Sequence, residues 1–438
     1  MNLYLRKHQF GNTKTEDLWK AFEESSGGGK RVEEIMSTWV KQKGYPMLSV
    51  SISKQENKNV LSIQQEKFTA NNTLPEETSL WSIPISISTA KNPNAIERSF
   101  ILDKKSVDII IDDIDCNSWI KLNPGTISYY RTRYTTDMLM KFVPSIRDMS
   151  LPALDRLGLI DDCFAMVQAG QMSTVDFLKI IDSYRNETNF TVWNAITNSI
   201  VKLQTILSQT NLNEHFNKYG QNLYSPICKR LGWDLIKVLN RLISFSCNNT
   251  IEEACKRFQN HVDGTCLLPA DLRSACYKAV LQSGDENTFI DMLKLYRETD
   301  LHEEKDRISR ALGSITIPDL LMKVIDFAMS DDVRSQDAVF IIVAVALNPK
   351  GRDLAWNFFK ENSNKLLQKY QGGFLLARLI KYLTENFASF EMAKEIEEYF
   401  KKMDFPGTER TVNQSIETII LNANWLKRDL DDIAKYLS

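Results

Sequence analysis

The spacing of apolar residues changes twice along the chain. In residues 32–40 they recur at i, i+3, i+4 and i+7, which predicts a short helix. From about residue 48 the period becomes two, because Leu48, Val50 and Ile52 alternate with serines, and this alternation is typical of a strand. After residue 134 the helical spacing returns and continues to the C-terminus. The pattern therefore predicts helices, then strands, then a long helical region.

The middle region predicts a small β-sandwich over residues 45–134. Short alternating runs recur there at intervals of about 8–12 residues, with polar turn residues between them. A hairpin is expected across the turn Glu56-Asn-Lys-Asn59. The expected strands cover residues 48–53, 60–65, 81–88, 96–102, 107–111 and 119–122.

Residues 135–438 predict the paired helices of an irregular α-solenoid. Most apolar faces there extend over about 10–18 residues, short polar loops join them, and no clear sequence repeat accompanies them. Thr250-Ile-Glu-Glu253 has the form of a capping box and predicts a helix start, and Gly264 predicts the end of that helix. The later expected helices cover residues 268–282, 289–297, 305–312, 317–329, 337–346, 353–370, 374–383, 391–401 and 411–426.

These patterns together predict a multidomain α+β protein in three parts. Residues 1–44 form a short helical segment, too small to close a core of its own, which is expected to be the tail of another domain. Residues 45–134 form the β-sandwich. Residues 135–438 form a large all-α domain of the solenoid type, similar to HEAT and armadillo repeats. Trp119–Tyr134 is the expected joint between the last two parts.

Composition narrows the classes of partner. The formal net charge of −2 gives no overall field that would attract nucleic acid, and no apolar run approaches the roughly 20 residues of a membrane span. Tyr129-Tyr-Arg-Thr-Arg133 is a weak basic and aromatic cluster, and it does not change this interpretation. The 7 cysteines are scattered through the sequence, and no secretory signal precedes them, which favours reduced thiols and a cytoplasmic location.

The sequence offers no recognisable catalytic or metal-binding pattern. His302-Glu-Glu-Lys-Asp306 begins like a zinc-binding H-E-x-x-H motif, but Asp306 stands where the second imidazole is needed. Cys255 and Cys266 lack a C-x-x-C spacing, and Cys255 falls on an apolar helix face, so it is interpreted as a core residue. No phosphate-binding loop, dinucleotide fingerprint or serine-nucleophile motif occurs. These residues alone indicate a binding or scaffolding module.

Several long segments add a resemblance that covers the chain in order. They are Tyr4-Leu-Arg-Lys-His-Gln-Phe-Gly-Asn-Thr-Lys-Thr-Glu-Asp-Leu-Trp19, Met36-Ser-Thr-Trp-Val-Lys-Gln-Lys-Gly-Tyr-Pro46, Trp119-Ile-Lys-Leu-Asn-Pro-Gly-Thr-Ile-Ser-Tyr-Tyr-Arg131, Asp155-Arg-Leu-Gly-Leu-Ile-Asp-Asp162, Ser225-Pro-Ile-Cys-Lys-Arg-Leu-Gly-Trp233, Ala270-Asp-Leu-Arg-Ser274, Tyr370-Gln-Gly-Gly-Phe374 and Leu421-Asn-Ala-Asn-Trp-Leu-Lys-Arg428. These segments resemble the sequence of the C-terminal half of the M1 family of zinc aminopeptidases, most closely that of its cytosolic puromycin-sensitive members. The stretch from Trp233 to Thr250 departs from those relatives and leaves the local helix pairing open.

The resemblance implies a role in peptide hydrolysis. In that family, a zinc ion, the H-E-x-x-H motif and a G-A-M-E-N loop perform the chemistry, and no position of this chain matches them. The C-terminal helices of the family cap a chamber that admits peptides, and basic side chains on its inner wall attract a peptide carboxylate. Arg378 and Arg410 are the candidate peptide-binding residues here, because each follows a Gly-containing loop into a helix. The alternative for each is a solvated surface arginine.

Two functional hypotheses remain open at this point. The chain is either part of, or a truncated protein related to, an M1 aminopeptidase, with peptides and a separate zinc domain as its partners. The alternative is a non-catalytic pseudo-aminopeptidase that binds peptides or proteins. The first hypothesis predicts that residues 1–43 expose an apolar face, with Trp19, Phe22 and Trp39 as its members. A buried face would favour the second.

Overall fold

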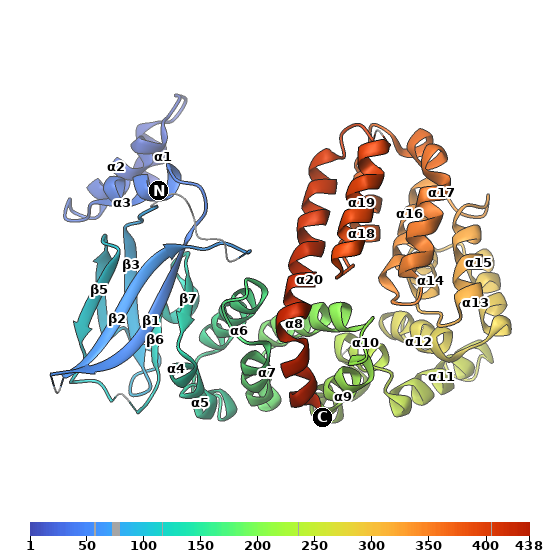
Figure 1. Cartoon of the computed structure of the whole chain (residues 1–438), viewed down its shortest axis with the longest axis horizontal. Coiled ribbons are helices and arrows are strands. Elements are labelled where there is room, and N and C mark those ends of the chain that lie inside the picture. Colours follow the sequence, from blue (N-terminus) through green and yellow to red (C-terminus); the bar gives the residue numbers. More distant parts are fainter. Residues whose placement is uncertain (57, 72–78, 116, 235, 404) are drawn as a thin grey trace. The chain divides into compact units, whose positions relative to one another are not determined.

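The computed structural model describes residues 1–56, 58–71, 79–115, 117–234, 236–403 and 405–438. Internal contacts divide the chain into two compact units, residues 1–197 and 198–438. The first contains two small sheets with helices before and after them, and the second consists of helices (Figure 1). The predicted multidomain α+β class is confirmed. The predicted boundary at residue 134 lies inside the first unit, and the three-part division stays a prediction.

Three short helices open the first unit: α1 (Asn2–Lys7), α2 (Thr15–Ser25) and α3 (Val32–Val40). The bounds of α3 agree with the helix that the apolar spacing predicts. The indole Nε1 of Trp39 donates a hydrogen bond to the carbonyl oxygen of Ser82 at 3.0 Å, and Gln42 Nε2 donates to that of Leu80 at 2.8 Å. These two bonds attach the end of α3 to the chain just before the second sheet.

Over the residues that the structure describes, seven strands form two sheets; β1 to β6 correspond to the predicted alternating runs, whereas β7 was not predicted. The first sheet has the order β5-β2-β1-β7 and the second β4-β3-β6. All neighbours are antiparallel except β1 and β7, which are parallel. The predicted hairpin is present, with Gln55 paired to Lys58, although Asn57 of its turn lies outside the described residues. The strands are β1 (Pro46–Gln55), β2 (Lys58–Lys67), β3 (Ile83–Thr89), β4 (Arg98–Leu102), β5 (Ser106–Ile110), β6 (Ile120–Leu122) and β7 (Arg131–Tyr134).

A buried glutamine joins the first sheet to the segment that enters the second. Gln65 on β2 lies on the same face as Leu61 and Ile63 and is fully buried with them. Its side-chain oxygen accepts from the backbone N–H of Trp81 at 2.9 Å, and its Nε2 donates to the carbonyl oxygens of Trp81 at 2.8 Å and Lys104 at 2.9 Å. Because Trp81 is fully buried, the amide satisfies the hydrogen-bonding needs of its backbone N–H and carbonyl groups inside an apolar core.

Helix α6 (Ala153–Gln168) packs directly against the first sheet. It belongs to a run of helices with α4 (Thr136–Met140), α5 (Val143–Arg147) and α7 (Thr174–Asp182), followed by α8 (Phe190–Leu207), which spans the boundary between the two units. Met47 of β1 forms a buried cluster with Ala165 and Met166 of α6. Trp119, just before β6, stacks on Phe142 with ring centroids 5.5 Å apart. Trp119 of the joint is therefore part of the core, as are Tyr130 and Tyr134.

The second unit is a curved row of paired helices. Each of α10, α12, α14, α16, α18 and α20 contacts the next of this set, while α11, α13, α15 and α17 lie on the outer side of the curve (Figure 1). Contacts between α20 and α9 show that the row returns toward its start. The helices are α9 (Asn213–Leu231), α10 (Ile236–Ser244), α11 (Asn248–Val262), α12 (Ala270–Ser283), α13 (Glu286–Glu298), α14 (His302–Leu312), α15 (Pro318–Ala328), α16 (Ser335–Leu347), α17 (Arg352–Tyr370), α18 (Phe374–Thr384), α19 (Phe390–Lys402) and α20 (Glu409–Leu437).

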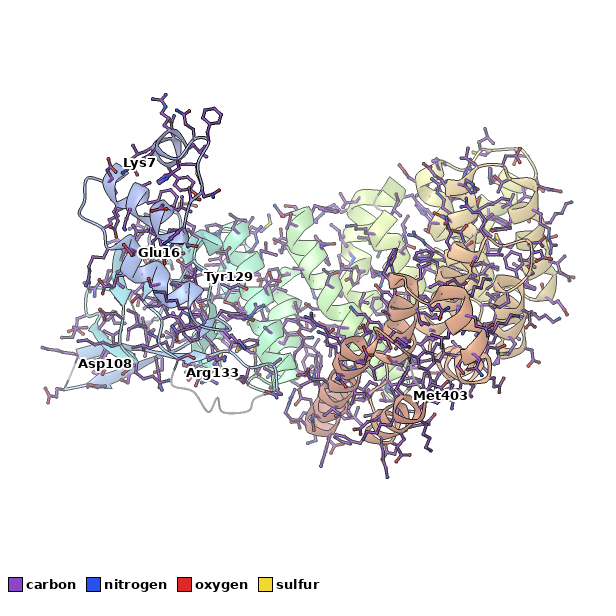
Figure 2. The ribbon with its side chains drawn as sticks, turned by 90° about the horizontal axis from the view of Figure 1, so that it is seen from above. Lys7, Glu16, Asp108, Tyr129, Arg133 and Met403 are labelled. Atoms are coloured by element: carbon purple, nitrogen blue, oxygen red, sulfur yellow. The ribbon has the colours of Figure 1, made fainter. Side chains whose placement is uncertain are left out.

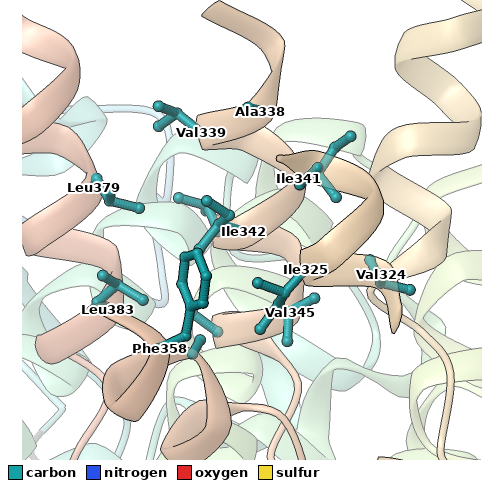
Figure 3. Packing of buried hydrophobic residues seen from close by; sticks show 14 of the residues in the cluster. Val324, Ile325, Ala338, Val339, Ile341, Ile342, Val345, Phe358, Leu379 and Leu383 are labelled. Atoms are coloured by element: carbon teal, nitrogen blue, oxygen red, sulfur yellow. The ribbon is translucent and has the colours of Figure 1, made fainter. Parts of the chain in front are cut away.

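Helix α16 is the centre of the second core. It is apolar on almost every side and contacts α14, α15, α17 and α18, so its neighbours cover most of it (Figure 3). Gly313 at the end of α14 allows a close approach, since a Cβ there would lie 2.3 Å from the carbonyl oxygen of Ala344. Asn348 then donates to the carbonyl oxygens of Gly313 at 2.8 Å and Ile315 at 2.7 Å, which satisfies backbone groups at the end of α14.

Three details of the predicted helices are wrong. Helix α11 begins at Asn248, so Thr250 lies inside it and is not a cap; its hydroxyl contacts Cys247 Sγ at 3.4 Å. Cys255 is half-buried, with its sulfur 3.5 Å from Ser283 Oγ, and is not a core residue. Helix α20 continues past residue 426 to Leu437. The predicted end of α11 is confirmed, because Gly264 follows the helix with a φ of 72°.

We expect Gln65→Leu to lower the free energy of unfolding by roughly 2–4 kcal/mol, because it leaves the buried backbone N–H and carbonyl groups of Trp81 unpaired. Gln64→Leu is the matched control, since Gln64 is an exposed residue next to it on the same strand. Urea denaturation of the purified chain, followed by fluorescence, measures both. Equal stability of the two variants would contradict the assigned role of Gln65.

Candidate functional site

The joint between the sheets and the helices depends on a buried ion pair. Lys121 on β6 lies 3.3 Å from Asp155 on α6, measured from Nζ to Oδ1, and their side chains are 5% and 2% exposed. Asp155 Oδ1 also accepts from the backbone N–H of Gly125 at 2.7 Å. The ammonium group of Lys121 donates to the carbonyl oxygen of Leu122 at 3.0 Å. Because both charges have further hydrogen-bonding partners, burial of the pair is tolerated.

The turn between β6 and β7 is fixed on the same helix. Asn123 adopts a left-handed conformation with a φ of 56°, and its amide exchanges two 2.8 Å hydrogen bonds with the backbone of Ser128. Gly158 of α6 faces Thr126, and a Cβ at Gly158 would lie 3.0 Å from Thr126 Cγ2. A larger residue at position 158 would therefore push the turn away from α6. Two of the segments that carry the family resemblance, residues 119–131 and 155–162, thus pack on each other.

Asp162, two turns after Asp155, binds the start of β7. Its Oδ1 lies 3.3 Å from Arg131 Nη1, and its Oδ2 accepts from the backbone N–H of Thr132 at 3.0 Å. The side chain is 19% exposed. Burial raises the pKa of Asp162 to about 6, and the charge of Arg131 offsets this effect only in part. Ionisation of this carboxyl group at neutral pH therefore costs more free energy in the folded state than in the unfolded state.

The aromatic and basic cluster of residues 129–133 is occupied by protein groups. Tyr129 is 71% exposed and packs on Tyr45 with ring centroids 5.3 Å apart. Arg133, labelled with Tyr129 in Figure 2, donates to Ser49 Oγ at 2.8 Å and Gln171 Oε1 at 3.2 Å. Together with the bond of Arg131 to Asp162, these contacts support packing at the joint as the role of the cluster.

A second buried ion pair follows the joint, and sequence reasoning missed it. Arg156 Nε and Nη2 donate to the two carboxylate oxygens of Glu187 at 2.7 Å and 2.9 Å. Glu187 Oε1 also accepts from the backbone N–H groups of Thr188 and Asn189 at the start of α8. The two charges are far apart in the sequence, and no local pattern pairs them. The two buried ion pairs of the joint thus position its helices against the strands.

The two candidate peptide-binding arginines lie on α18 and α20. Arg378 is exposed, and its guanidinium carbon lies 4.9 Å from the centroid of the Phe340 ring on α16 and 5.8 Å from that of Tyr382. Arg410 is exposed in the first turn of α20. Helices α18 and α20 are in contact. Within the described ranges, neither arginine forms an ion pair with a carboxylate, and no contact joins the two.

The zinc ion that the family resemblance implies has no fitting donor set here. His302 is exposed at the start of α14, while the neighbouring Glu304 is turned inward and bonded to Tyr277. Over the described part of the chain, no group of three or more His, Cys, Asp or Glu side chains is placed to hold a metal ion. We therefore derive no step through zinc from these residues. In the same ranges, every helix is too short or too polar to traverse a lipid bilayer.

Comparisons with known proteins agree with this architecture. Two small sheets followed by a long row of paired helices define a multidomain α+β protein with a helical-repeat C-terminal region. The model of the ERAP1-like C-terminal domain family matches residues 119–421. Aminopeptidase M1 of Arabidopsis thaliana is 32% identical, over 97% of this chain and 50% of the relative. The chain belongs to the M1 aminopeptidase family and matches the C-terminal half of its members.

Other relatives show the same coverage. The puromycin-sensitive aminopeptidase of Caenorhabditis elegans is 27% identical over 100% of this chain and 48% of its own length. The alanine/arginine aminopeptidase of Saccharomyces cerevisiae is 27% identical over 99% of this chain and 51% of its own length. The chain therefore spans about half the length of the curated relatives that it matches. The resemblance that the sequence segments predict is confirmed.

Asp162 predicts a pH dependence of stability. Because its folded pKa of about 6 is raised above the usual value of 3.8, its contribution to stability is fully present below the unfolded pKa and is lost as pH rises through about 6. We expect the chain to gain stability relative to Asp162→Asn as pH falls from about 7 to about 5. Thermal unfolding of both proteins across this range measures the difference.

Asp148→Asn is the control for this measurement. A hydrogen bond from Ser150 lowers the pKa of the exposed Asp148, so its contribution is lost only as pH falls through that lowered value, below the window. A constant difference between the chain and Asp162→Asn over the window would show that Asp162 is not buried as described.

Proposed function

We propose that this chain encloses and gates peptides for an aminopeptidase of the M1 family. The observation that carries the proposal is that nearly all of the chain matches members of that family. The curved row of helices supports it, because α10, α12, α14 and α16 present one continuous layer on the inner side of the curve (Figure 1). Hydrolysis itself is assigned to a zinc-binding domain that acts with this chain.

The first three helices support an interaction with such a domain. Among residues 1–44, all of which the structure describes, Ala21 is the only fully buried residue. Trp19, Phe22 and Trp39 are each half-buried, although apolar side chains of this size are usually covered in a finished core. The predicted apolar face is therefore partly covered by the chain's own residues, and we propose that a zinc domain covers the remainder.

Arg378 and Arg410 are the proposed contacts for the peptide carboxylate. Arg378 is held over two aromatic rings, which limits its side-chain freedom and lowers the entropy lost when it binds an anion. Arg410 lies near the N-terminal end of α20, where the helix dipole also favours a negative charge. The two residues come from helices that are in contact, α18 and α20.

We also propose a cytoplasmic location. The cysteines in the described part of the chain, Cys163, Cys228, Cys247, Cys255, Cys266 and Cys276, are all free thiols. Free thiols in a long chain are typical of a reducing compartment. The C. elegans relative is a puromycin-sensitive aminopeptidase, and this sequence resembles that cytosolic branch of the family.

The proposal predicts that the chain alone has no peptidase activity and that it supports activity when combined with a zinc domain. The purified chain with added zinc should not hydrolyse an aminoacyl fluorogenic substrate. Mixing it with the separately produced other half of the Arabidopsis relative should restore chelator-sensitive hydrolysis of peptides, and the double variant Trp19→Ser/Phe22→Ser should weaken this restoration. Ile101→Ser on β4 is the control for an exposed apolar residue.

Chelator-sensitive turnover by the chain alone would contradict the assignment of catalysis to another domain. Peptide binding without any restored turnover would instead favour a non-catalytic, peptide-binding scaffold. Loss of restoration in Ile101→Ser as well as in Trp19→Ser/Phe22→Ser would show that the N-terminal helices have no special part in docking.

Arg378 and Arg410 predict a preference for a free peptide C-terminus. An acetylated neutral peptide with a free carboxylate should bind the chain roughly fivefold to tenfold more tightly than its C-terminal amide, because charge-assisted hydrogen bonds are stronger than neutral ones. The double variant Arg378→Gln/Arg410→Gln should reduce this ratio toward one. Fluorescence anisotropy measures the affinities. A ratio that the double variant leaves unchanged would show that both residues are ordinary surface arginines.

A further inference from the structure

Three neighbouring helices of the inner layer carry cations on their incompletely buried faces. Arg241 lies on α10, Lys278 on α12 and Arg310 on α14. Helix α10 contacts α12, and α12 contacts α14. Arg241 and Lys278 are half-buried, and Arg310 is exposed. The three side chains therefore belong to one stretch of the layer, and part of that stretch is accessible.

These cations lack the partners that other cations on the same helices have. Arg273 of α12 and Arg307 of α14 pair with the buried Glu304 at 3.2 Å and 2.7 Å. In the ranges that the structure describes, neither Arg241 nor Lys278 nor Arg310 forms an ion pair or a side-chain hydrogen bond. Glu304 thus neutralises Arg273 and Arg307, whereas Arg241, Lys278 and Arg310 stay uncompensated in the same ranges.

The three positive charges also act on one another. Burial lowers the pKa of Lys278, and the charges of Arg241 and Arg310 lower it further. Burial likewise lowers the pKa of Arg241. Like charges that are held together and partly desolvated destabilise each other, so a negative group placed among them would be attracted strongly.

We propose that Arg241, Lys278 and Arg310 form an anion site for acidic side chains of a bound peptide. This inference rests on the proposed peptide-enclosing function. Packed helix axes lie about 8–10 Å apart, so three consecutive helices span roughly 20 Å, whereas an extended peptide advances about 3.3 Å per residue. The site therefore matches several residues of a peptide. Carboxylate side chains distributed along the peptide fit it better than the single carboxylate at a C-terminus.

The test compares peptides that differ only in acidic side chains. The probe is a fluorescent peptide, acetylated at the N-terminus and amidated at the C-terminus, with glutamates in its central residues, and the comparison peptide has glutamines in their place. We expect the glutamate peptide to bind the full chain roughly tenfold more tightly by anisotropy. Lys278→Gln should remove most of that difference, and Arg310→Gln, an exposed position, should reduce it as well.

Lys365→Gln is the matched control, because it removes the same charge at an exposed position on α17, in the outer layer. We expect it to leave the difference unchanged. Lys278→Gln relieves repulsion between cations, so its thermal unfolding midpoint should not fall, and this measurement separates loss of binding from loss of folding.

Several results would overturn the inference. One is equal binding of the glutamate and glutamine peptides, and another is an equal loss in Lys365→Gln and Lys278→Gln. A glutamine peptide with a free C-terminus tests whether the site binds the terminal carboxylate instead. If Lys278→Gln weakens binding of that peptide but not of the glutamate peptide, the cations bind the C-terminus and the proposed side-chain site is wrong. In each of these cases the chain still binds peptides. Failure of every peptide to bind would overturn the proposed function itself.

Discussion

The ion pair between Lys121 and Asp155 determines how the sheets of the first unit join their helices. Both side chains are almost fully buried, so removing either one would leave the other charge without its partner in a dry environment, a change that typically costs about 3–5 kcal/mol. Asp155 also binds the backbone of Gly125, and Asp162 on the same face of α6 binds the backbone of Thr132. One helix thereby fixes both ends of the turn between β6 and β7, and β7 is then in place to pair with β1.

Local patterns predicted most of the elements but few of their contacts. Alternation placed Gln65 on the apolar face of its strand, yet nothing near it in sequence shows that Trp81 and Lys104 supply its hydrogen bonds. At α11 the local signal was misleading. The chain leaves α10 through Ser246 in a left-handed conformation and begins α11 at once, so Thr250 is already inside the helix when its capping pattern would start one.

In the candidate sites, too, local sequence patterns identify some residues but not their contacts with distant parts of the chain. Arg378 and Arg410 were found because each follows a glycine-containing loop, which is visible in the sequence, but the rings of Phe340 and Tyr382 that hold Arg378 come partly from another helix. Arg241, Lys278 and Arg310 were missed, because they are adjacent only through the contacts of α10, α12 and α14. They matter because Glu304 pairs with other cations and leaves these three unpaired. No spacing in the sequence shows which cations Glu304 pairs with.

The charge of the whole chain conceals this arrangement. A formal net charge of −2 argues correctly against a general attraction for nucleic acid, since that attraction depends on an extended field. A bound peptide, however, interacts over distances comparable to the screening length of about 8 Å in physiological salt, so the charges that it meets are those of a few neighbouring side chains. On α12 and α14, Glu304 pairs with Arg273 and Arg307 and leaves Lys278 and Arg310 unpaired. A nearly neutral protein can therefore have a locally positive region, and the proposed selectivity for acidic peptides rests on that local balance.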